Sequence, residues 1–439
     1  MAKKKQPQIH LTGFMLYCPA PHMIMSWVYP EQKMTAGKWS DIEYWASIAK
    51  TLERGKFDMF FFADGWAGGV NEPGIKYAIQ FPTHDPALLV PYLSSVAPRL
   101  SYAITMSTTF YEPYMVARKM STLDHITKGK IGWNIVCSIS SGEAKNFGMD
   151  ELPPHDLRYD RADEFMEVCH KLWNSWEPGA LLMDMERKIF ADPTKIHKIN
   201  HVGKWFKCQG PLTVAPSPQG RPYLFQAGSS ERGRDFAIKH ADCIFALGAG
   251  VEQMRAFSDD IKARADRAGR NPDEIKIIWG AQPIIADSEQ EARNRMKEIR
   301  ARIPLEASLA LMSGHFNVDL TQFDVDTPVT ELKNFDVSGT KGMFESYAKD
   351  NPKVTLRDIA GTYLSGSDDN PMAGTGEQVA DYMIHLIEEG GGNGFQITPS
   401  YYAPRFYEDV VNGLIPVLQR RGVYRTEYDG STLRDYMNG

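Results

Sequence analysis

Three consecutive residues between an apolar run and a charged segment could bind an anion. Gly228, Ser229 and Ser230 follow the run RPYLFQA and precede a segment with helical spacing. A helix that begins directly after a glycine leaves backbone N–H groups unpaired at its positive end, and this arrangement suits a phosphate. The two serine hydroxyls can bind that phosphate or simply cap the helix, since serine is a preferred N-cap residue. The stretch has neither the glycine spacing of a dinucleotide-binding turn nor the Gly-Lys-Ser/Thr of a nucleotide-binding loop. Both a helix cap and a phosphate site of another kind therefore remain open.

Further polar side chains stand within or at the ends of other apolar runs. Asp64 ends the run FDMFFFAD, Thr105 lies in LSYAITMST, and Asn134 lies in KIGWNIVCS. No Ser-His-Asp order, nucleophile elbow or pair of general-acid carboxylates is evident among such residues. Side chains that are polar but largely uncharged at the ends of these runs suit the binding of a bulky polar cofactor better than they suit hydrolysis.

The elements that must position these residues alternate regularly. Eight apolar, strand-like runs are each followed by an amphipathic segment with helical spacing. This alternation predicts a parallel sheet covered by helices, and eight units predict an α/β fold of the closed (β/α)8 barrel type. An open, doubly wound sheet is the alternative. In a barrel the chemistry lies at the carboxyl ends of the strands, which is where the polar residues stand. The eight runs are LTGFMLYC, FDMFFFAD, LSYAITMST, KIGWNIVCS, RPYLFQAG, DCIFALGA, IKIIWGAQPIIA and NGFQITPS.

Two segments interrupt the alternation, and we interpret both as insertions in a single domain that spans residues 1–439. Residues 177–220 are rich in proline and glycine and predict a hairpin-bearing excursion. Residues 304–372 are long and weakly periodic, which is typical of a lid over a binding site.

The composition excludes several classes of protein. The chain of 439 residues has 49 basic and 55 acidic residues and a net charge of −6, so nucleic-acid binding is not expected. No apolar stretch is long enough to span a membrane, and the N-terminus lacks a signal-peptide core, so we expect a cytoplasmic protein. The five cysteines form no C-x-x-C pair, which argues against a disulfide scaffold. His197 and His201 lie in an alternating, hairpin-like stretch without a carboxylate ligand set, so we expect no metal site there.

Six motifs in order resemble one known family along nearly the whole chain. The family is the large component of two-component flavin monooxygenases, the nitrilotriacetate, dibenzothiophene-sulfone and pristinamycin monooxygenase group of the bacterial luciferase-like superfamily. The resemblance implies a (β/α)8 barrel that takes reduced FMN (FMNH2) from a separate NAD(P)H:flavin reductase, reacts it with O2 through a flavin C4a-(hydro)peroxide, and oxygenates a small organic molecule. It also implies a homodimer or homotetramer. The motifs are RGKFDMFFFADG, STLDHITKGKIGWNIV, KNFGMDELPPHDLRYDRADEFMEVCHKLWNSW, PSPQGRPYLFQAGSSERGRDFA, GTGEQVAD and RRGVYRTEYDGSTLRDYM.

The resemblance also assigns the residues at the anion site. Ser229 and Ser230 match positions that bind the FMN phosphate, Tyr159 joins them through its hydroxyl, and His155 lies close by. This agrees with the independent expectation of an anion at a helix N-terminus. For Tyr159, packing on the barrel rim is the alternative.

The ring of the flavin is assigned to three further residues. Asp64, Thr105 and Asn134 match flavin-contacting positions of the family. Without the resemblance, an aspartate that ends a strand more often caps its own turn, and Thr105 could equally be a core residue.

Two histidines match positions that lie over the flavin in the sulfone-oxidising branch of the family. These are His22, after the first strand, and His315, in the second insertion. An imidazole that titrates near neutral pH can donate a proton or orient a reactive oxygen, so we expect both to be catalytic; a surface location is the alternative. Ile139 stands where the alkane-oxidising relative has a histidine, which makes alkane hydroxylation less expected.

The substrate class follows from the segments expected to frame the pocket. PAPHMIMSWVYP and DGWAGGVNEPGIKYAIQFP are rich in Met, Trp, Pro and Tyr and poor in cations. A polycarboxylate would need Arg or Lys partners, so an uncharged or weakly charged aromatic or organosulfur molecule is favoured. A deazaflavin-dependent hydride transferase and a non-catalytic flavin-binding barrel remain as alternatives.

Overall fold

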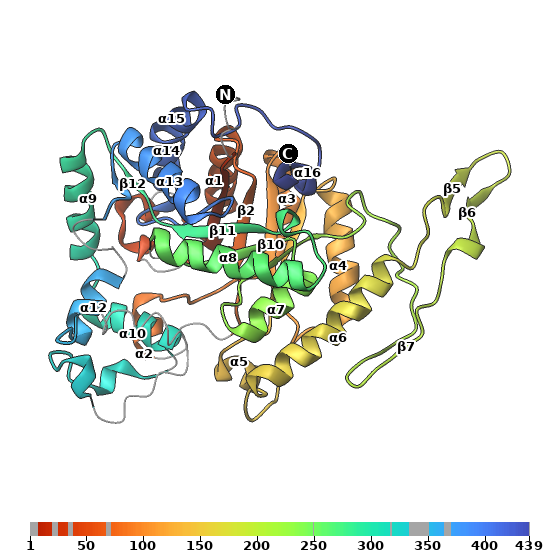
Figure 1. Cartoon of the computed structure of the whole chain (residues 1–439), viewed down its shortest axis with the longest axis horizontal. Helices are drawn as coiled ribbons and strands as arrows, with labels where there is room; N and C mark the ends of the chain where they lie inside the picture. Colours follow the sequence, from red (N-terminus) through yellow and green to blue (C-terminus); the bar gives the residue numbers. More distant parts are fainter. Residues whose placement is uncertain are drawn as a thin grey trace.

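The computed structural model describes residues 8–19, 25–33, 38–66, 72–248, 250–316, 318–332, 351–363 and 370–438. Eight parallel strands close into a barrel in the order β1-β14-β11-β10-β9-β4-β3-β2 (Figure 1). Each strand coincides with one of the eight apolar runs, although β1 begins one residue before its run, at His10, so the predicted barrel is confirmed and the open sheet is excluded. The strands are β1 (His10–Leu16), β2 (Met59–Ala63), β3 (Ser101–Ser107), β4 (Ile131–Val136), β9 (Tyr223–Gln226), β10 (Cys243–Ala246), β11 (Lys276–Ala281) and β14 (Gly394–Ile397).

Both faces of each barrel strand are buried, which explains why the runs are continuously apolar rather than alternating. In β1, Phe14 and Leu16 point into the barrel and pack against Phe61 of β2 and Phe225 of β9. Leu11 and Met15 point outward into the larger core between strands and helices. Side chains on the inner face near the carboxyl ends of the strands are therefore held by a packed core beneath them.

A ring of helices covers the outer face of the barrel. The first begins at Asp41, whose side chain accepts a hydrogen bond from the N–H of Glu43, and it buries Trp45, Ile48 and Leu52. Not every helix belongs to this ring; those that the structure describes are α1 (Ile42–Arg54), α2 (Glu72–Tyr77), α3 (Val90–Val96), α4 (Pro113–Ile126), α5 (Ser141–Asn146), α6 (His155–Trp173), α7 (Glu231–His240), α8 (Val251–Arg267), α9 (Glu289–Ala301), α10 (Leu305–Phe316), α12 (Leu356–Tyr363), α13 (Gly376–Gly390), α14 (Ala403–Gly413), α15 (Ile415–Arg420) and α16 (Leu433–Asn438).

The helix predicted after the seventh strand is present as α9, but it packs against a small two-stranded sheet of β12 (Ile284–Ile285) and β13 (Ala373–Gly374). The helix that packs beside α8 on the barrel is α13, which follows the second long excursion. It buries Val379, Met383 and Ile387, spaced four residues apart on one face.

The amino-terminal end of the barrel is closed by the C-terminal segment. Leu433 of α16 belongs to the core inside the barrel, and its N–H donates to the carbonyl of Gly129. Nearby, the fully buried Asp58 carboxylate accepts from Arg425 at 2.6 Å and lies 3.1 Å from Nδ1 of His10. The carboxyl ends of the strands lie at the opposite end, which we call the mouth of the barrel.

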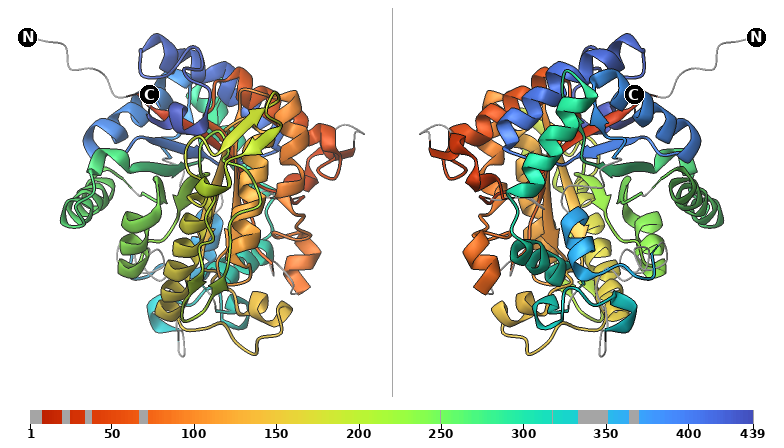
Figure 2. Two further views of the ribbon diagram at one scale, coloured as in Figure 1. Left: turned by 90° about the vertical axis from the view of Figure 1, so that its right-hand side faces the viewer. Right: turned by 90° about the vertical axis from the view of Figure 1, so that its left-hand side faces the viewer.

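Two excursions extend from the barrel. Between α6 and β9 the chain forms two hairpins, β5 (Leu181–Asp184) with β6 (Ile189–Ala191) and β7 (His201–Val202) with β8 (Lys207–Cys208), which project as an arm (Figures 1 and 2). The second excursion contributes α10 and α12, which form with α2 a separate apolar cluster on the side of the molecule away from the two termini (Figure 1). Within the described ranges, no helix combines the length and apolar character that a membrane crossing requires.

Candidate active site at the mouth of the barrel

The predicted cofactor-binding residues lie on one side of the barrel mouth. Asp64 follows β2, Thr105 lies in β3, Asn134 lies in β4, and Gly228-Ser229-Ser230 follows β9. These four strands are consecutive neighbours in the barrel. Tyr159 approaches the same turn from α6, as described below. Residues separated by up to 166 positions in the chain (64 to 230) are therefore brought to one rim.

Thr105 and Asn134 are joined by a chain of hydrogen bonds inside the barrel. The Asn134 Nδ2 donates to Thr105 Oγ1 at 2.9 Å, and that hydroxyl donates to the carbonyl of Phe62 at 2.9 Å. The Asn134 Oδ1 is buried and has no hydrogen-bond partner among the described residues, and the same holds for Nε2 of Gln396 on β14. Buried polar atoms are normally paired. The two atoms lie on β4 and β14, four strands apart in the closed barrel, so each is a separate polar group that a bound molecule could pair with.

Asp64 lies in an environment that favours its neutral form. Burial raises the pKa of its carboxyl from the ordinary 3.8 to about 7, although the N–H of Gly65 donates to Oδ1 at 2.9 Å and opposes the rise. The carboxylates of Asp85 and Glu143 raise it further, and the Lys119 ammonium lowers it slightly. Near pH 7 the Asp64 carboxyl therefore exists in both protonation states and can donate as well as accept a hydrogen bond.

Ser230 caps helix α7. Its hydroxyl accepts from the N–H of Gly233 at 3.1 Å, as expected for an N-cap. The N–H groups of residues 229–232 donate to no acceptor in the part of the chain that the structure describes. The positive end of α7 therefore presents unpaired donors to the mouth, which is the arrangement that binds phosphate.

Tyr159 and two glycines form the floor of this turn. A Cβ placed on Gly228 or on Gly233 would lie 2.8 Å from the Tyr159 hydroxyl, so only glycine allows the turn, the helix and the phenol to approach this closely. Burial raises the pKa of Tyr159 to about 12, so its hydroxyl remains a hydrogen-bond donor at neutral pH. The Nε2 of His155 lies 3.3 Å from the Ser230 hydroxyl, which places this exposed imidazole at the edge of the same turn.

Two polar residues at this site were missed by sequence reasoning. Gln226 is buried on β9, accepts from the N–H of Gly228 at 2.6 Å through Oε1, and directs Nε2 toward the Tyr159 hydroxyl at 3.4 Å. Arg158 donates to the carbonyl of Ser138 after β4 and has a buried Nε without a partner among the described residues. A glutamine at an outward-facing strand position, where its neighbours are apolar, was the available signal for Gln226.

An aromatic group lines the loops after β2, β3 and β4. The Trp66 ring lies 5.6 Å from the ring of Tyr111 and 5.4 Å from that of Phe147, which stacks on Phe110 at 4.6 Å. The backbone N–H of Trp66 donates to the Glu143 carboxylate at 3.1 Å, so the loop that carries Trp66 is fixed to α5. Trp66 and Phe147 are exposed, and they give this side of the mouth an apolar surface.

The two candidate catalytic histidines differ in what the structure shows. His22 lies outside the described residues. His315 is near the end of α10, part-buried, with Nδ1 2.6 Å from the Tyr363 hydroxyl of α12. Burial lowers the pKa of His315 to about 4, so its imidazole is neutral at pH 7. In this state it can orient a group by hydrogen bonding but cannot supply a proton as an imidazolium.

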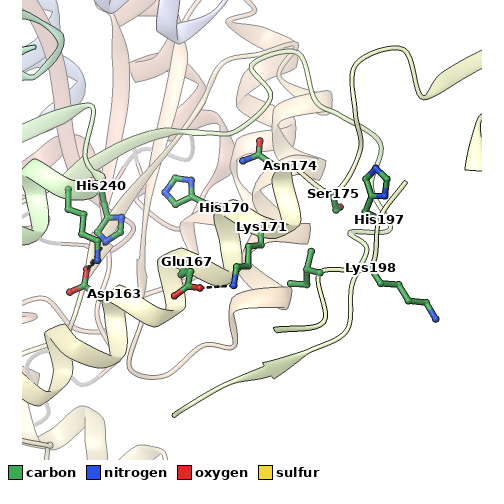
Figure 3. A pocket seen from close by; sticks show the side chains of 11 residues that line it. Asp163, Glu167, His170, Lys171, Asn174, Ser175, His197, Lys198 and His240 are labelled. Atoms are coloured by element: carbon green, nitrogen blue, oxygen red, sulfur yellow. Dashed lines mark hydrogen bonds and ion pairs between the residues drawn. The ribbon is translucent and has the colours of Figure 1, made fainter. Parts of the chain in front are cut away.

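An open cavity of about 680 Å³ lies elsewhere, on the flank of the barrel at the root of the arm (Figure 3). It is bounded by α6, by the end of α7 and by residues 197–199, and none of the predicted site residues line it. Its carboxylates are already paired, Glu167 with Lys171 at 2.6 Å and Asp163 with Lys239 at 2.9 Å. Across the described ranges, no three His, Cys, Asp or Glu side chains are grouped as a metal ion requires.

Comparison with known proteins decides the family. A family model described as luciferase-like monooxygenase matches residues 23–394. The chain belongs to this family. It is 39% identical over 446 residues to the dibenzothiophene-sulfone monooxygenase of Rhodococcus erythropolis (strain XP), an alignment that covers 99% of this chain and 97% of that protein. The resemblance inferred from the motifs is thereby confirmed, as is the enzyme class, a flavin-dependent monooxygenase.

Two other similar proteins bear on the cofactor and on partners. Nitrilotriacetate monooxygenase component A of Aminobacter aminovorans is 36% identical, covering 97% of this chain and 95% of that protein. The crystal structure of a riboflavin lyase with modified FMN and its substrate riboflavin matches with a TM-score of 0.88 at 33% identity, covering 98% of this chain and 96% of that one. Flavin is thus found with this fold in a relative of clearly similar sequence.

Proposed function

We propose that this protein is an FMNH2-dependent monooxygenase that inserts oxygen from O2 into a small, weakly charged organosulfur or aromatic molecule. The observation that carries the proposal is the turn after β9, where unpaired N–H groups, two glycines and the Tyr159 hydroxyl converge. When bound, reduced FMN supplies the electrons that activate O2, and this chemistry belongs to the cofactor. The protein must bind it, orient it, exclude water and control protons.

The phosphate of FMN would be held at the start of α7. Residues 229–232 offer their N–H groups, Ser229 and Ser230 add hydroxyls, and Tyr159 adds a phenolic donor. His155 stands at the edge of the turn, 3.3 Å from Ser230. Because Ser230 already caps the helix, its hydroxyl accepts from Gly233 and can still donate its own proton to a phosphate oxygen. Capping and phosphate binding are thus compatible at this residue.

The ring of the flavin would lie over the barrel mouth. Asn134 offers its unpaired Oδ1, and Thr105 holds the Asn134 side chain in place from the other side. Asp64, with a pKa of about 7, can donate to the ring or accept from it. His22 and His315 are proposed to hold or orient groups of the substrate, and His315 would do so as a neutral imidazole held by Tyr363.

The substrate class is inferred from the aromatic group at the mouth and from one relative. Trp66 and Phe147 offer apolar surface beside β2, and the Lys119 ammonium lies 5.3 Å from the centroid of the Tyr111 ring in the same group. The relative with 39% identity is named for a sulfone of an aromatic thiophene. A cyclic or aromatic sulfone is therefore the first substrate to assay.

The reductase is proposed to be a separate protein. Within the ranges that the structure describes, no strand–glycine-loop–helix unit fits a dinucleotide, and one relative is named as component A of its system. Purified protein should oxygenate a sulfone only when a flavin reductase with NAD(P)H supplies FMNH2. Oxidation of NAD(P)H by this chain alone, or turnover without O2, would refute the two-component monooxygenase.

The phosphate site can be tested by comparing reduced FMN with reduced riboflavin in anaerobic titrations. A hydrogen bond to a charged group is worth about 1.5–3 kcal/mol, so Tyr159→Phe should weaken FMNH2 binding by about ten- to a hundred-fold. Binding of reduced riboflavin should hardly change, because it has no phosphate. The matched control is Tyr114→Phe, which removes an exposed hydroxyl that contacts Thr213. Equal losses for both flavins would mean that Tyr159 serves only packing.

A further inference from the structure

One buried carboxylate joins the loops that follow β2 and β4. It belongs to Glu143 of α5, which is 7% exposed. Its Oε1 accepts from the backbone N–H of Trp66 at 3.1 Å, and its Oε2 accepts from the backbone N–H of Ser140 at 3.4 Å. Asn146, three positions further along α5, donates from Nδ2 to the carbonyl of Trp66 at 2.7 Å. Both polar groups of the Trp66 backbone are therefore held by one short helix.

The place of that helix is fixed in turn by a strained residue at the end of β4. Ser138 has a positive φ of 57°, a conformation that a residue with a side chain rarely adopts. Its hydroxyl donates to that of Ser107 at 2.9 Å, and its carbonyl accepts from Arg158. Such strain persists only where the surroundings hold it, and it is concentrated at functional sites. The turn leads directly into α5, which lies on the side of the molecule away from both termini (Figure 1).

The Trp66 ring is restrained as well, yet it remains open to solvent. Its contacts with the rings of Tyr111 and Phe147 come from the loop after β3 and from the end of α5. The side chain is nevertheless 39% exposed. An indole that is held by its backbone and by part of its ring loses little conformational freedom when a ligand covers the rest. Trp66 is thus pre-organised to contact a further ring.

The loop that carries Trp66 also carries the proposed flavin contact Asp64, so this inference rests on the proposed function. Two residues separate these positions by at most about 7 Å along the chain. The Glu143 carboxylate is close enough to Asp64 to raise the pKa of that carboxyl. A molecule that contacts Trp66 therefore lies beside the proposed flavin site rather than on a remote surface.

The apolar side chains on the two joined loops indicate what kind of molecule this is. Ile139, which directly precedes Ser140, is 71% exposed. An indole and a branched aliphatic side chain thus project from the two backbones that Glu143 joins. A flat, uncharged ring can gain both apolar burial and a ring–ring contact there, whereas an aliphatic chain gains only the burial.

We propose that Trp66 is a specificity-determining residue that contacts a flat ring of the substrate, and that Glu143 and Asn146 are the positioning residues that hold it for this contact. The role is one of selection. A substrate without a ring should not benefit from it.

Anaerobic equilibrium dialysis of the full chain with FMNH2 tests the proposal without turnover. The two probes are dibenzothiophene sulfone and dibutyl sulfone, which share the sulfone group and differ in the flat ring system. In Trp66→Leu the preference for dibenzothiophene sulfone, expressed as the ratio of the two dissociation constants, should fall about three- to ten-fold, the scale of one ring–ring contact. Trp66→Phe keeps a ring and should retain most of the preference. The matched control is Phe190→Leu, which removes an exposed ring on the arm and should leave the ratio unchanged.

The positioning residues are tested in two backgrounds. Asn146→Ala and Glu143→Gln should each lower the same ratio in the wild type, because each removes a contact to the Trp66 backbone. Neither should lower it further in Trp66→Leu, since both act through the indole. A merely structural role would lower the Tm in both backgrounds without this dependence. The matched control is Lys145→Ala, at an exposed position of the same helix.

Three results would overturn the proposal. An unchanged ratio in Trp66→Leu, or a wild type that binds neither sulfone, would show that no ring lies against the indole. Equal losses for both sulfones would make Trp66 a part of the fold only, and additive effects of Asn146→Ala and Trp66→Leu would show that Asn146 does not act through it. Ring-selective binding without product from FMNH2 and O2 would refute the proposed function and leave this inference standing. If Trp66→Leu fails to fold, Trp66→Met, checked by circular dichroism, supplies the same comparison.

Discussion

Above about pH 4, the buried Asp64 carboxyl should lower the stability of the flavin-free protein. Replacing Asp64 by a neutral residue should show how large this loss of stability is. The folded state keeps the Asp64 proton up to about pH 7, because burial raises the pKa of this carboxyl from 3.8. The unfolded chain releases the proton near pH 4. The folded state therefore loses stability as the pH rises from about 4 to about 7, and the loss is complete above pH 7. Asp64→Asn is neutral at every pH, retains an oxygen that can accept from Gly65, and removes this loss.

The magnitude follows from the difference in pKa. One pH unit corresponds to 1.36 kcal/mol, so a rise from 3.8 to about 7 costs up to about 4 kcal/mol at pH 8 and about 1.5 kcal/mol at pH 5. The unfolding entropy is about 2.1 cal/mol/K per residue, or about 0.9 kcal/mol/K for 439 residues. Asp64→Asn should therefore raise the Tm by about 4 °C at pH 8 and by about 1.5 °C at pH 5.

Scanning calorimetry of the flavin-free protein at the two pH values measures this difference. The control is Asp259→Asn, which neutralises an exposed carboxylate in the middle of α8 and should shift the Tm equally at both pH values. If Asp64 serves the flavin, the same variant should bind FMNH2 more weakly although it is more stable. A Tm gain that does not depend on pH, or a loss of stability at pH 8, would show that the Asp64 carboxyl is ionised and solvated in the folded protein.

Three further predictions concern other parts of the chain. Asp58→Asn should lower the free energy of unfolding by about 3–5 kcal/mol in denaturant titrations, because it leaves the buried Arg425 guanidinium uncompensated; an unchanged midpoint would contradict the buried ion pair. Glu164→Gln should release the root of the arm, where the Glu164 carboxylate accepts from the N–H groups of residues 204–206, and speed proteolytic cleavage within residues 196–206, with cleavage elsewhere as the internal control. His315→Ala should leave FMNH2 binding within a few-fold while product formed per O2 consumed falls about 100-fold, and unchanged coupling would make His315 a structural partner of Tyr363.

The barrel could be predicted from the sequence because burial on both faces leaves a simple signature. Each strand is a short, almost uninterrupted apolar run, and each run is followed by a helix. The seventh run, residues 275–286, was predicted as a single strand, whereas the structure divides it into β11 and β12. Pro283 lies at the break and has no N–H to donate to a ladder, which explains why barrel pairing ends there.

The exposure of the β5–β6 hairpin and the place of helix α13 could not be predicted from local patterns. The hairpin was predicted from its prolines and glycines, but its exposed apolar side chains do not differ in sequence from residues that face a core. The helix α13 has a clear apolar face, yet a long excursion separates it from the strand that it follows, and chain order alone favours the earlier helix α9. In both cases the sequence does not show which surface of the protein lies opposite the apolar side chains. That depends on tertiary packing rather than on the spacing of residues along the chain.

The serines after β9 show why sequence reasoning could not choose between a cap and a phosphate site. Capping uses the lone pairs of the Ser230 hydroxyl, which accept from the N–H of Gly233. Phosphate binding would use its proton and the N–H groups of residues 229–232, so the two uses draw on different atoms of one motif. The structure adds what the motif lacks, since Tyr159, from 70 residues away in the chain, lies so close to Gly228 and Gly233 that any side chain there would meet its hydroxyl. A cap alone requires no such convergence, whereas an anion site benefits from it, because the Tyr159 hydroxyl then lies beside the start of α7.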